Sequence, residues 1–345
     1  MKDMNIVVIG MAGSGKTSFV RAFYKHCKRQ KESCYTINLD PAVTSTPYKC
    51  NIDIRDSVNY KKVMEEYRLG PNGAIMTSLN LFTTKIDQVV SIVEKKKGYV
   101  IVDTPGQIEA FIWSATGPIV TEALATAHPT VVVYVIDTPR TTAPATFMSN
   151  MLYACSILYK TRLPFLIVFN KSDLQDSEFA VEWMTDFEKF QNALDPEAYM
   201  SSLMSSMSLV LEEFYAALDF VSVSSHTGAG MSDLTAALQK KADEFETEYK
   251  VQREEIARKR EEKEEKERKA QMAKLSADLG LGVPAQTVSD QEDEVSEPGE
   301  NDGWIDNDDY EETNEVDAAG IQDRYSKALK TEQLNEQFQK QLNLS

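Results

Sequence analysis

The stretch IVVIGMAGSGKT, residues 6–17, decides the fold class of this protein. An apolar run leads into a glycine-rich loop of the form G-x-x-x-x-G-K-T, and a helical pattern follows over residues 18–30. In this context the backbone N–H groups of the loop and the helix N-terminus attract phosphate groups. Lys16 would reach the β and γ oxygens, and Thr17 would offer its hydroxyl to Mg²⁺. The stretch predicts a P-loop nucleotide site contacted by Gly13, Ser14, Gly15, Lys16, Thr17 and Ser18.

Apolar runs alternate with helical patterns along the rest of the chain up to about residue 248, which is typical of βαβ units. Several of these runs are apolar throughout, as strands covered by helices on both faces should be. We therefore expect an α/β fold, a P-loop NTPase with a mostly parallel central sheet flanked by helices. The predicted strands are 5–9, 35–39, 99–103, 131–137, 165–170 and 220–224.

The acidic residues are concentrated near the end of the chain. The 345 residues carry a formal net charge of −17, from 37 Lys and Arg against 54 Asp and Glu. Fourteen acidic residues, and no Lys or Arg, lie between residues 290 and 317. Such a segment repels itself and buries little apolar surface, so we expect it to be disordered. The acidic balance also argues against direct binding of nucleic acid, which depends on Lys and Arg at the phosphates.

These patterns divide the chain into three predicted parts. Residues 1–248 form the nucleotide-binding domain. Residues 249–275 are rich in helix formers and i,i+4 charge pairs but poor in apolar heptad positions, which predicts a charged helix or a weak coiled coil. Residues 276–345 are expected to be a mostly disordered acidic tail, with a short helix over 321–344 as an alternative for its end.

The apolar runs and the cysteines indicate a soluble intracellular protein. The longest apolar runs, 131–136 and 165–169, are far shorter than the roughly 20 residues of a membrane-spanning helix. Nothing before the first strand resembles a signal peptide. The four cysteines, Cys27, Cys34, Cys50 and Cys155, have no zinc-site spacing, so we expect reduced, buried thiols.

An acidic motif follows the third predicted strand. Asp103 opens the sequence DTPG, where a carboxylate can hold Mg²⁺ through water or orient the attacking water, and the N–H of Gly106 can contact the γ-phosphate. Gln107 comes next, and its amide can align a water without acting as a base. The alternative for Gln107 is a surface residue. Asp40, after the second strand, fits a second acid near the metal, with a turn or helix-capping aspartate as the alternative.

The motif NKSD, residues 170–173, ends the fifth predicted strand and indicates a guanine site. An ionised Asp173 accepts from the N1–H and the exocyclic amine of guanine, whereas adenine presents an acceptor at N1. The sequence therefore predicts GTP rather than ATP, with Asn170, Lys171 and Asp173 at the base. The backbone of Ser225, after the last strand, could meet guanine O6, and His226 has a weak signal as a ligand.

The segment GPNG, residues 70–73, predicts a turn when it is interpreted from local chemistry alone. Pro71 fixes φ and the flanking glycines accept unusual dihedral angles, so Gly70, Pro71 and Asn72 would lie in a loop after a helical pattern over 57–67.

Seven segments together resemble the GPN-loop GTPase family. The resemblance extends from the N-terminus to about residue 248, and the charged helix and acidic extension resemble the first eukaryotic branch of that family. The segments are GMAGSGKT (10–17), NLDPA (38–42), NIDIRD (51–56), LGPNGA (69–74), DTPGQIE (103–109), FMSNMLYACSILYK (147–160) and NKSD (170–173).

The resemblance implies functions that the residues alone do not. It implies a dimeric GTPase of the signal-recognition-particle and MinD-like class, in which Asn72 reaches the phosphates bound by a partner subunit. It also implies that Asp103 positions the attacking water with help from Gln107, and that Thr17 with Asp40 organises Mg²⁺. The cofactors would be GTP, GDP and Mg²⁺.

The resemblance also suggests a cellular role. The branch is associated with RNA polymerase II assembly and nuclear import, so the expected clients are RNA polymerase II subunits. We expect a cytoplasmic protein that shuttles to the nucleus, acts as a switch or chaperone, and pairs with itself or with a paralogous GTPase. Two alternatives stay open at this stage, a P-loop kinase for a small acceptor and a scaffold that binds GTP without turnover.

Overall fold

The computed structural model describes residues 3–194, 204, 206–207, 211, 214–215, 218–251, 258 and 268. The chain divides into two units, Met1–Asp278 and Leu279–Ser345, and only the first contains described residues. The predicted acidic tail and terminal helix lie outside the described residues. Of the predicted charged helix only 249–251, 258 and 268 are described, and these are helical.

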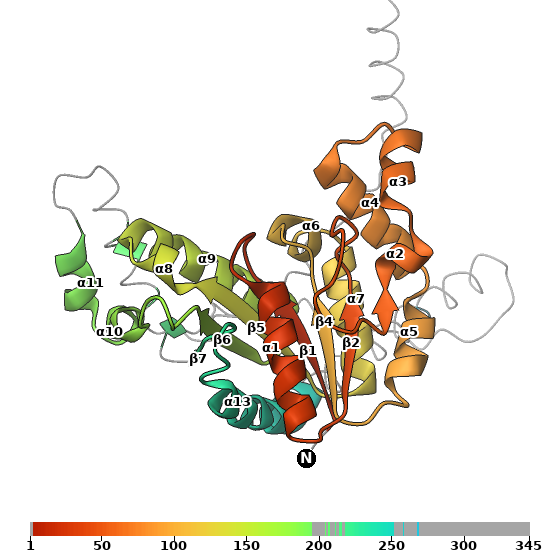
Figure 1. Ribbon diagram of the computed structural model, residues 1–345. Helices are drawn as coiled ribbons and strands as arrows, with labels where there is room; N and C mark the ends of the chain where they lie inside the picture. Colours follow the sequence, from red (N-terminus) through yellow and green to blue (C-terminus); the bar gives the residue numbers. More distant parts are fainter. Residues whose placement is uncertain are drawn as a thin grey trace, which may run out of the picture. The chain divides into compact units, whose positions relative to one another are not determined.

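A seven-stranded sheet forms the centre of the first unit (Figure 1). Its order is β3-β2-β4-β1-β5-β6-β7, and every neighbouring pair is parallel. This confirms the predicted α/β fold with a parallel sheet. The strands are β1 (Met4–Ile9), β2 (Cys34–Asn38), β3 (Ile52–Asp53), β4 (Tyr99–Asp103), β5 (Thr130–Asp137), β6 (Phe165–Asn170) and β7 (Asp219–Val223).

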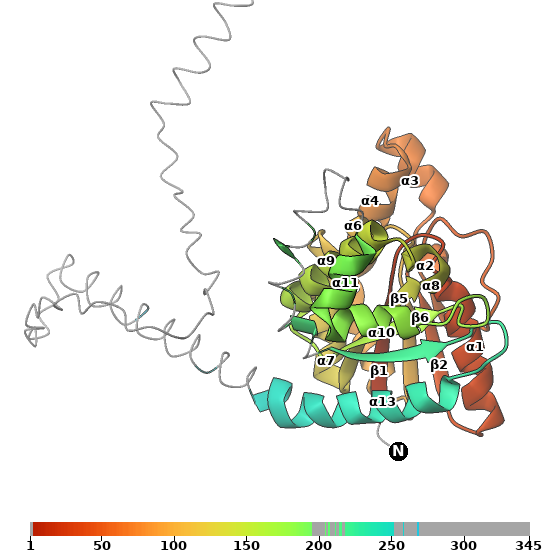
Figure 2. The ribbon, with the colours of Figure 1, turned by 90° about the vertical axis from the view of Figure 1, so that its left-hand side faces the viewer.

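Helices cover both faces of the sheet. Helices α1 (Lys16–Arg29) and α13 (Met231–Glu244) pack on one face, and a π-helical turn, η1 (Phe245–Tyr249), continues α13 (Figures 1 and 2). The core of the opposite face draws buried side chains from the helices between them. These are α2 (Ile54–Ser57), α3 (Tyr60–Glu66), α4 (Pro71–Thr83), α5 (Ile86–Val93), α6 (Ile108–Ile112), α7 (Thr116–Ala127), α9 (Pro144–Thr161), α10 (Glu178–Thr185) and α11 (Phe187–Ala193).

The side chains of β1 show how one strand serves both layers. Met4, Ile6 and Val8 belong to the core beneath α1 and α13, whereas Val7 and Ile9 belong to the core on the opposite face. This alternation follows from the two-residue period of a strand. Because both faces are buried, nearly every residue of the strand must be apolar, which is why the sequence shows an uninterrupted run.

The strand order places the functional edge of the sheet. Strand β1 lies between β4 and β5, and the chain connections leave in opposite directions from this point. Open parallel sheets bind ligands in the crevice beyond the carboxyl ends of the strands at such a reversal. The P-loop, Asp103, Asp137 and Asn170 all stand at this edge, because they end β1, β4, β5 and β6.

Two local expectations are wrong, and one strand was missed. Gly70 to Gly73 is not a turn but the start of α4, with Gly70 as N-cap and Pro71 in the first helical turn. Proline is well placed there, because the first N–H groups of a helix have no partner within it. Strand β3 was not predicted, since two residues carry no periodic signal. Of the free cysteines only Cys27 is buried, and the other three are half-buried.

None of the helices within the described part of the chain is long and apolar enough to cross a membrane.

Candidate nucleotide-binding site

The P-loop between β1 and α1 depends on glycine at specific positions. Gly15 has φ of +92°, in the left-handed region that glycine adopts without strain. A Cβ on Gly15 would lie 2.6 Å from Nδ2 of Asn170, and one on Gly10 would lie 2.4 Å from the carbonyl oxygen of Val135. Neither position therefore tolerates a side chain, and the loop stays close to β5 and β6.

Lys16, the first residue of α1, is held inside the loop. Its Nζ donates to the carbonyl oxygens of Gly10 at 2.7 Å and Met11 at 3.1 Å, and the residue is only 6% exposed. Burial lowers the pKa of Lys16, and the nearby charges of Asp103 and Asp40 oppose this effect. The ammonium group thus lies between the phosphate loop and two carboxylates.

Asp103 at the end of β4 is almost completely buried. Burial raises its pKa to about 6, while the hydroxyls of Tyr48 and Thr17 and the charge of Lys16 act in the opposite direction. The hydroxyl of Tyr48 donates to Oδ2 at 2.9 Å. The other oxygen, Oδ1, has no hydrogen-bond partner among the described residues. A buried carboxylate oxygen without a partner is costly, and a metal-bound water could supply the missing donor.

Asp40 lies near the same group of charges. Burial raises its pKa, against the Ala42 N–H and the charge of Lys16. Its Oδ1 accepts from the backbone N–H of Ala42 at 2.9 Å, so the carboxylate also closes a turn. Both interpretations of Asp40, metal-site acid and turn aspartate, are compatible with this placement.

The group around Thr17, Asp40 and Asp103 fits Mg²⁺ bound together with a nucleotide. The described residues contain no cluster of three or more His, Cys, Asp or Glu side chains that could hold a metal on their own. Mg²⁺ does not need one, because with nucleotides it takes one or two protein oxygens and completes its shell with phosphates and water. Thr17 and the free oxygen of Asp103 provide such donors.

Asn170 connects the two loops that would enclose a base. Its Nδ2 donates to the carbonyl oxygen of Ser14 at 2.9 Å, and its Oδ1 accepts from the hydroxyl of Ser225 at 2.7 Å. The backbone N–H of Ser225 also points to Oδ1, at 3.2 Å. Ser225 therefore lies beside the NKSD motif, and Asn170 connects the P-loop to the loop after β7.

Asp173 is oriented by the loop after β7. The hydroxyl of Ser224 donates to its Oδ1 at 2.6 Å, and this bond lowers the pKa of Asp173. The carboxylate is therefore ionised at neutral pH and presents only acceptors. Its second oxygen can face the paired donors on the edge of guanine.

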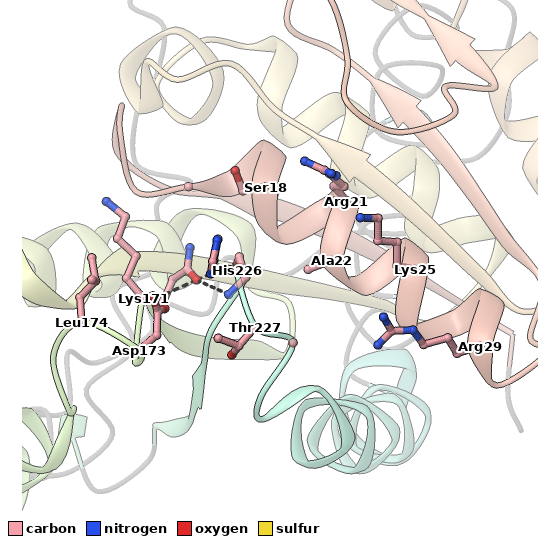
Figure 3. A pocket seen from close by; sticks show the side chains of 14 residues that line it. Ser18, Arg21, Ala22, Lys25, Arg29, Lys171, Asp173, Leu174, His226 and Thr227 are labelled. Carbon is pink, nitrogen blue, oxygen red and sulfur yellow. Dashed lines mark hydrogen bonds between the residues drawn. The ribbon is translucent and has the colours of Figure 1, made fainter.

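These loops and α1 line a cavity of about 720 Å³. Figure 3 shows Ser18, Arg21 and Lys25 along α1 on one side, and Lys171 and Asp173 on the other. Its volume falls in the range typical of small-molecule sites. The cavity joins the predicted phosphate contact of Ser18 to the predicted base reader Asp173, so one nucleotide can span both.

The start of α4 meets the DTPG loop at the rim of the site. The side-chain amide of Gln107 donates to Oδ1 of Asn72 at 2.7 Å, and this pair is exposed to solvent. The structure thus brings together two predicted catalytic residues that are 35 positions apart. Helix α4 also packs against α6, the helix that follows Gln107.

Several residues near the site were missed from the sequence. Asp137 ends β5, and its Oδ2 accepts from Nζ of Lys171 at 2.7 Å. Arg140, three residues later, lies over Gly13 of the P-loop. Tyr48 is the third, through its bond to Asp103. The sequence did contain a signal for Asp137, because this acid ends an apolar strand as Asp103 does. Tyr48 and Arg140 stand in no comparable sequence pattern.

Comparison with known proteins extends this picture. A family model described as "Conserved hypothetical ATP binding protein" matches residues 8–244. Curated relatives named GPN-loop GTPase 1 are 49% identical in Saccharomyces cerevisiae, covering 95% of this chain and 94% of the relative, and 50% identical in Schizosaccharomyces pombe, covering 88% of each. The Arabidopsis thaliana GPN-loop GTPase QQT2 is 57% identical over 70% of this chain and 65% of its own length.

A solved structure supports the same assignment. An apo-form GTPase from Pyrococcus abyssi is 27% identical, with a TM-score of 0.61, and the match covers 69% of this chain and 97% of that one. The relatives and the motif geometry agree on a guanine nucleotide, although the family model's description names ATP. On this evidence the chain is a GTP hydrolase and belongs to the GPN-loop GTPase family.

Proposed function

We propose that this GTP hydrolase depends on Mg²⁺ and works as a dimeric switch or chaperone in RNA polymerase II assembly and nuclear import. The observation that carries the catalytic part is the buried carboxylate of Asp103, whose Oδ1 has no partner among the described residues. It lies next to Lys16 and Thr17 of the P-loop. When bound, Mg²⁺ would be held by Thr17 and the nucleotide phosphates, and it would offset negative charge on the β and γ oxygens.

The chain's own residues would position the attacking water. Asp103 is fixed by Tyr48 and can accept from that water, and Gln107 can align it through its amide. Lys16 neutralises the phosphates directly. Since phosphoryl transfer depends mainly on positioning and charge stabilisation, these groups suffice without a strong base.

Pairing with a second subunit is part of the proposal. Asn72 is exposed at the start of α4, so its amide is accessible to a partner's phosphates. Large apolar side chains are exposed on neighbouring elements, namely Met76 of α4, Trp113 after α6, Ile119 of α7 and Leu152 of α9. Helices α4, α6, α7 and α9 are joined by contacts between neighbours, and exposed apolar surface on adjoining elements is typical of protein interfaces. We propose a homodimer or a heterodimer with a paralogous GTPase.

The proposed clients are RNA polymerase II subunits, and this part rests on the family resemblance of the charged C-terminal region. A chaperone that shuttles between cytoplasm and nucleus would bind its client in one nucleotide state and release it in the other. The test is affinity purification of the tagged full chain from cell extract with a non-hydrolysable GTP analogue or with GDP. We expect recovery of RNA polymerase II subunits to differ at least about fivefold between the two states. Equal recovery, or none in either state, would contradict the client assignment while leaving GTP hydrolysis untouched.

A further inference from the structure

The guanidinium group of Arg140 lies directly over the P-loop. Its Nη1 is 3.4 Å from the position that a Cβ on Gly13 would occupy, and Cζ and Nη2 are each 3.9 Å away. Arg140 belongs to α8 (Thr138–Thr141), which starts directly after β5. The short helix thus brings a second cation beside Gly13, in addition to Lys16 inside the loop.

Asp137 anchors this cation but does not neutralise the site. Its Oδ2 lies 3.5 Å from Nε of Arg140 and 2.7 Å from Nζ of Lys171, so one carboxylate serves two cations. Lys171 also donates to the carbonyl oxygen of Gly13, at 3.0 Å. The three side chains therefore leave a net positive charge beside Gly13.

The donors of Arg140 are still available. Its side chain is 72% exposed, and its ion pair with Asp137 uses Nε. Among residues 3–194 and 218–251, no hydrogen-bond partner is assigned to Nη1 or Nη2. Those two nitrogens carry four N–H groups in a planar fork, the geometry that matches two oxygens of a phosphate.

The position of Gly13 along the loop indicates which phosphate is in reach. The neighbouring Ala12 contacts Gly106 of the DTPG motif, since a Cβ on Gly106 would lie 3.6 Å from that of Ala12. On the other side, Gly15 contacts Asn170 of the base-binding motif. Gly13 therefore lies between the end of the loop where the DTPG motif is expected to meet the γ-phosphate and the base end, which is where we expect the middle phosphate.

We propose that Arg140 binds the β-phosphate of GTP and GDP from the side of α8, with Asp137 as its anchor. The plainer alternative is a solvated surface arginine that only balances the charge of Asp137. The two differ in which ligands depend on the side chain. A β-phosphate contact affects GTP and GDP alike and leaves guanosine and GMP untouched.

The test measures the affinity of the full chain for GTP analogue, GDP, GMP and guanosine by isothermal titration calorimetry, in the presence of Mg²⁺. Arg140→Ala should weaken GTP analogue and GDP by the same factor, roughly tenfold, because charge-assisted bonds to phosphate are stronger than neutral ones. Arg140→Lys keeps the charge without the fork, so it should recover only part of that loss.

Lys160→Ala is the matched control for the loss of one positive charge. Lys160 is exposed in the last turn of α9, just before β6 begins, so it lies at the amino edge of the sheet, opposite the site. The affinities of Lys160→Ala for all four ligands should equal those of the wild type. An equal loss for all four ligands in Arg140→Ala would indicate a structural role and overturn the proposal. So would affinities within twofold of the wild type, or a loss confined to the GTP analogue, which would place the contact at the γ-phosphate.

Discussion

Asp103 combines a proposed catalytic role with an unfavourable environment. The residue is 2% exposed, one of its oxygens lacks a partner among the described residues, and burial raises its pKa to about 6. Its ordinary pKa, about 3.8, applies in the unfolded chain. The folded state therefore binds a proton more tightly than the unfolded state between these two values. The free energy of unfolding falls as the pH rises from about 3.8 to about 6. Above about pH 6 the ionised, buried carboxylate destabilises the fold by its full amount.

The free-energy cost of burying the ionised Asp103 predicts the effect of replacing this residue in the nucleotide-free protein. Asp103→Asn should raise the free energy of unfolding near pH 7.5 by roughly 1 to 3 kcal/mol, because the amide carries no charge to desolvate. The gain should shrink as the pH is lowered from about 6 to about 4, where the wild-type carboxyl is already protonated. Urea unfolding without Mg²⁺ measures it. GTP turnover of the same variant should fall at least about a hundredfold. A stability difference that does not change with pH would contradict the assignment.

We expect Asp173 to decide which base is bound. In Asp173→Asn, an amide donor replaces a carboxylate acceptor opposite the N1–H and amine of guanine. We expect GTP affinity to fall on the order of tenfold to a hundredfold. Xanthosine triphosphate, which has a carbonyl in place of that amine, should bind the variant better than GTP does. Titration of both nucleotides against both proteins checks this, and unchanged GTP affinity would refute Asp173 as the base reader.

At the scale of elements, the sequence predicted the buried strands and missed the features that depend on contacts between elements. Six strands were predicted to within about one residue, because strands covered on both faces must be apolar throughout. The edge strand β3 has two residues and gave no such signal. Asn72 was placed in a turn because Pro71 is equally at home in a turn and in the first turn of a helix. Its contact with Gln107 could not be predicted from the sequence, since it depends on how α4 packs against α6.

Helix α4 carries the test of pairing between subunits. If Asn72 completes a partner's site, Asn72→Ala should slow turnover by the equivalent of about 2 to 4 kcal/mol of barrier, with nucleotide affinity nearly unchanged. The change should leave α4 intact, because Gly70 caps the helix and Asn72 caps nothing. Steady-state turnover and nucleotide titration of the single variant measure both effects.

Mixing two inactive variants separates action in the partner from action within one subunit. A Lys16→Ala subunit keeps its Asn72, and an Asn72→Ala subunit keeps its phosphate site, so the mixture should regain measurable GTP hydrolysis. If light scattering shows dimers of both kinds of subunit and the mixture is still inactive, the bond to Gln107 within one subunit is the functional contact instead.

At the scale of the whole molecule, the residues assigned to the site all lie within the first unit, Met1–Asp278. A chain ending at residue 285 keeps every phosphate, base and metal residue named above. We expect its GTP turnover to stay within about a factor of three of the full chain, while client recovery changes. Measuring GTP turnover and client recovery for both chains checks these two expectations. A large loss of GTP hydrolysis would show that the acidic segment takes part in catalysis.

The unpartnered oxygen of Asp103 also has a consequence for the lifetime of the protein in a cell. A ligand that supplies the missing donor stabilises the folded chain in proportion to the logarithm of its concentration over its dissociation constant. Empty molecules open more often than loaded ones, and the opened chain is the form that proteases degrade. The half-life of the protein should therefore follow the supply of guanine nucleotide, and cells depleted of GTP should degrade it faster.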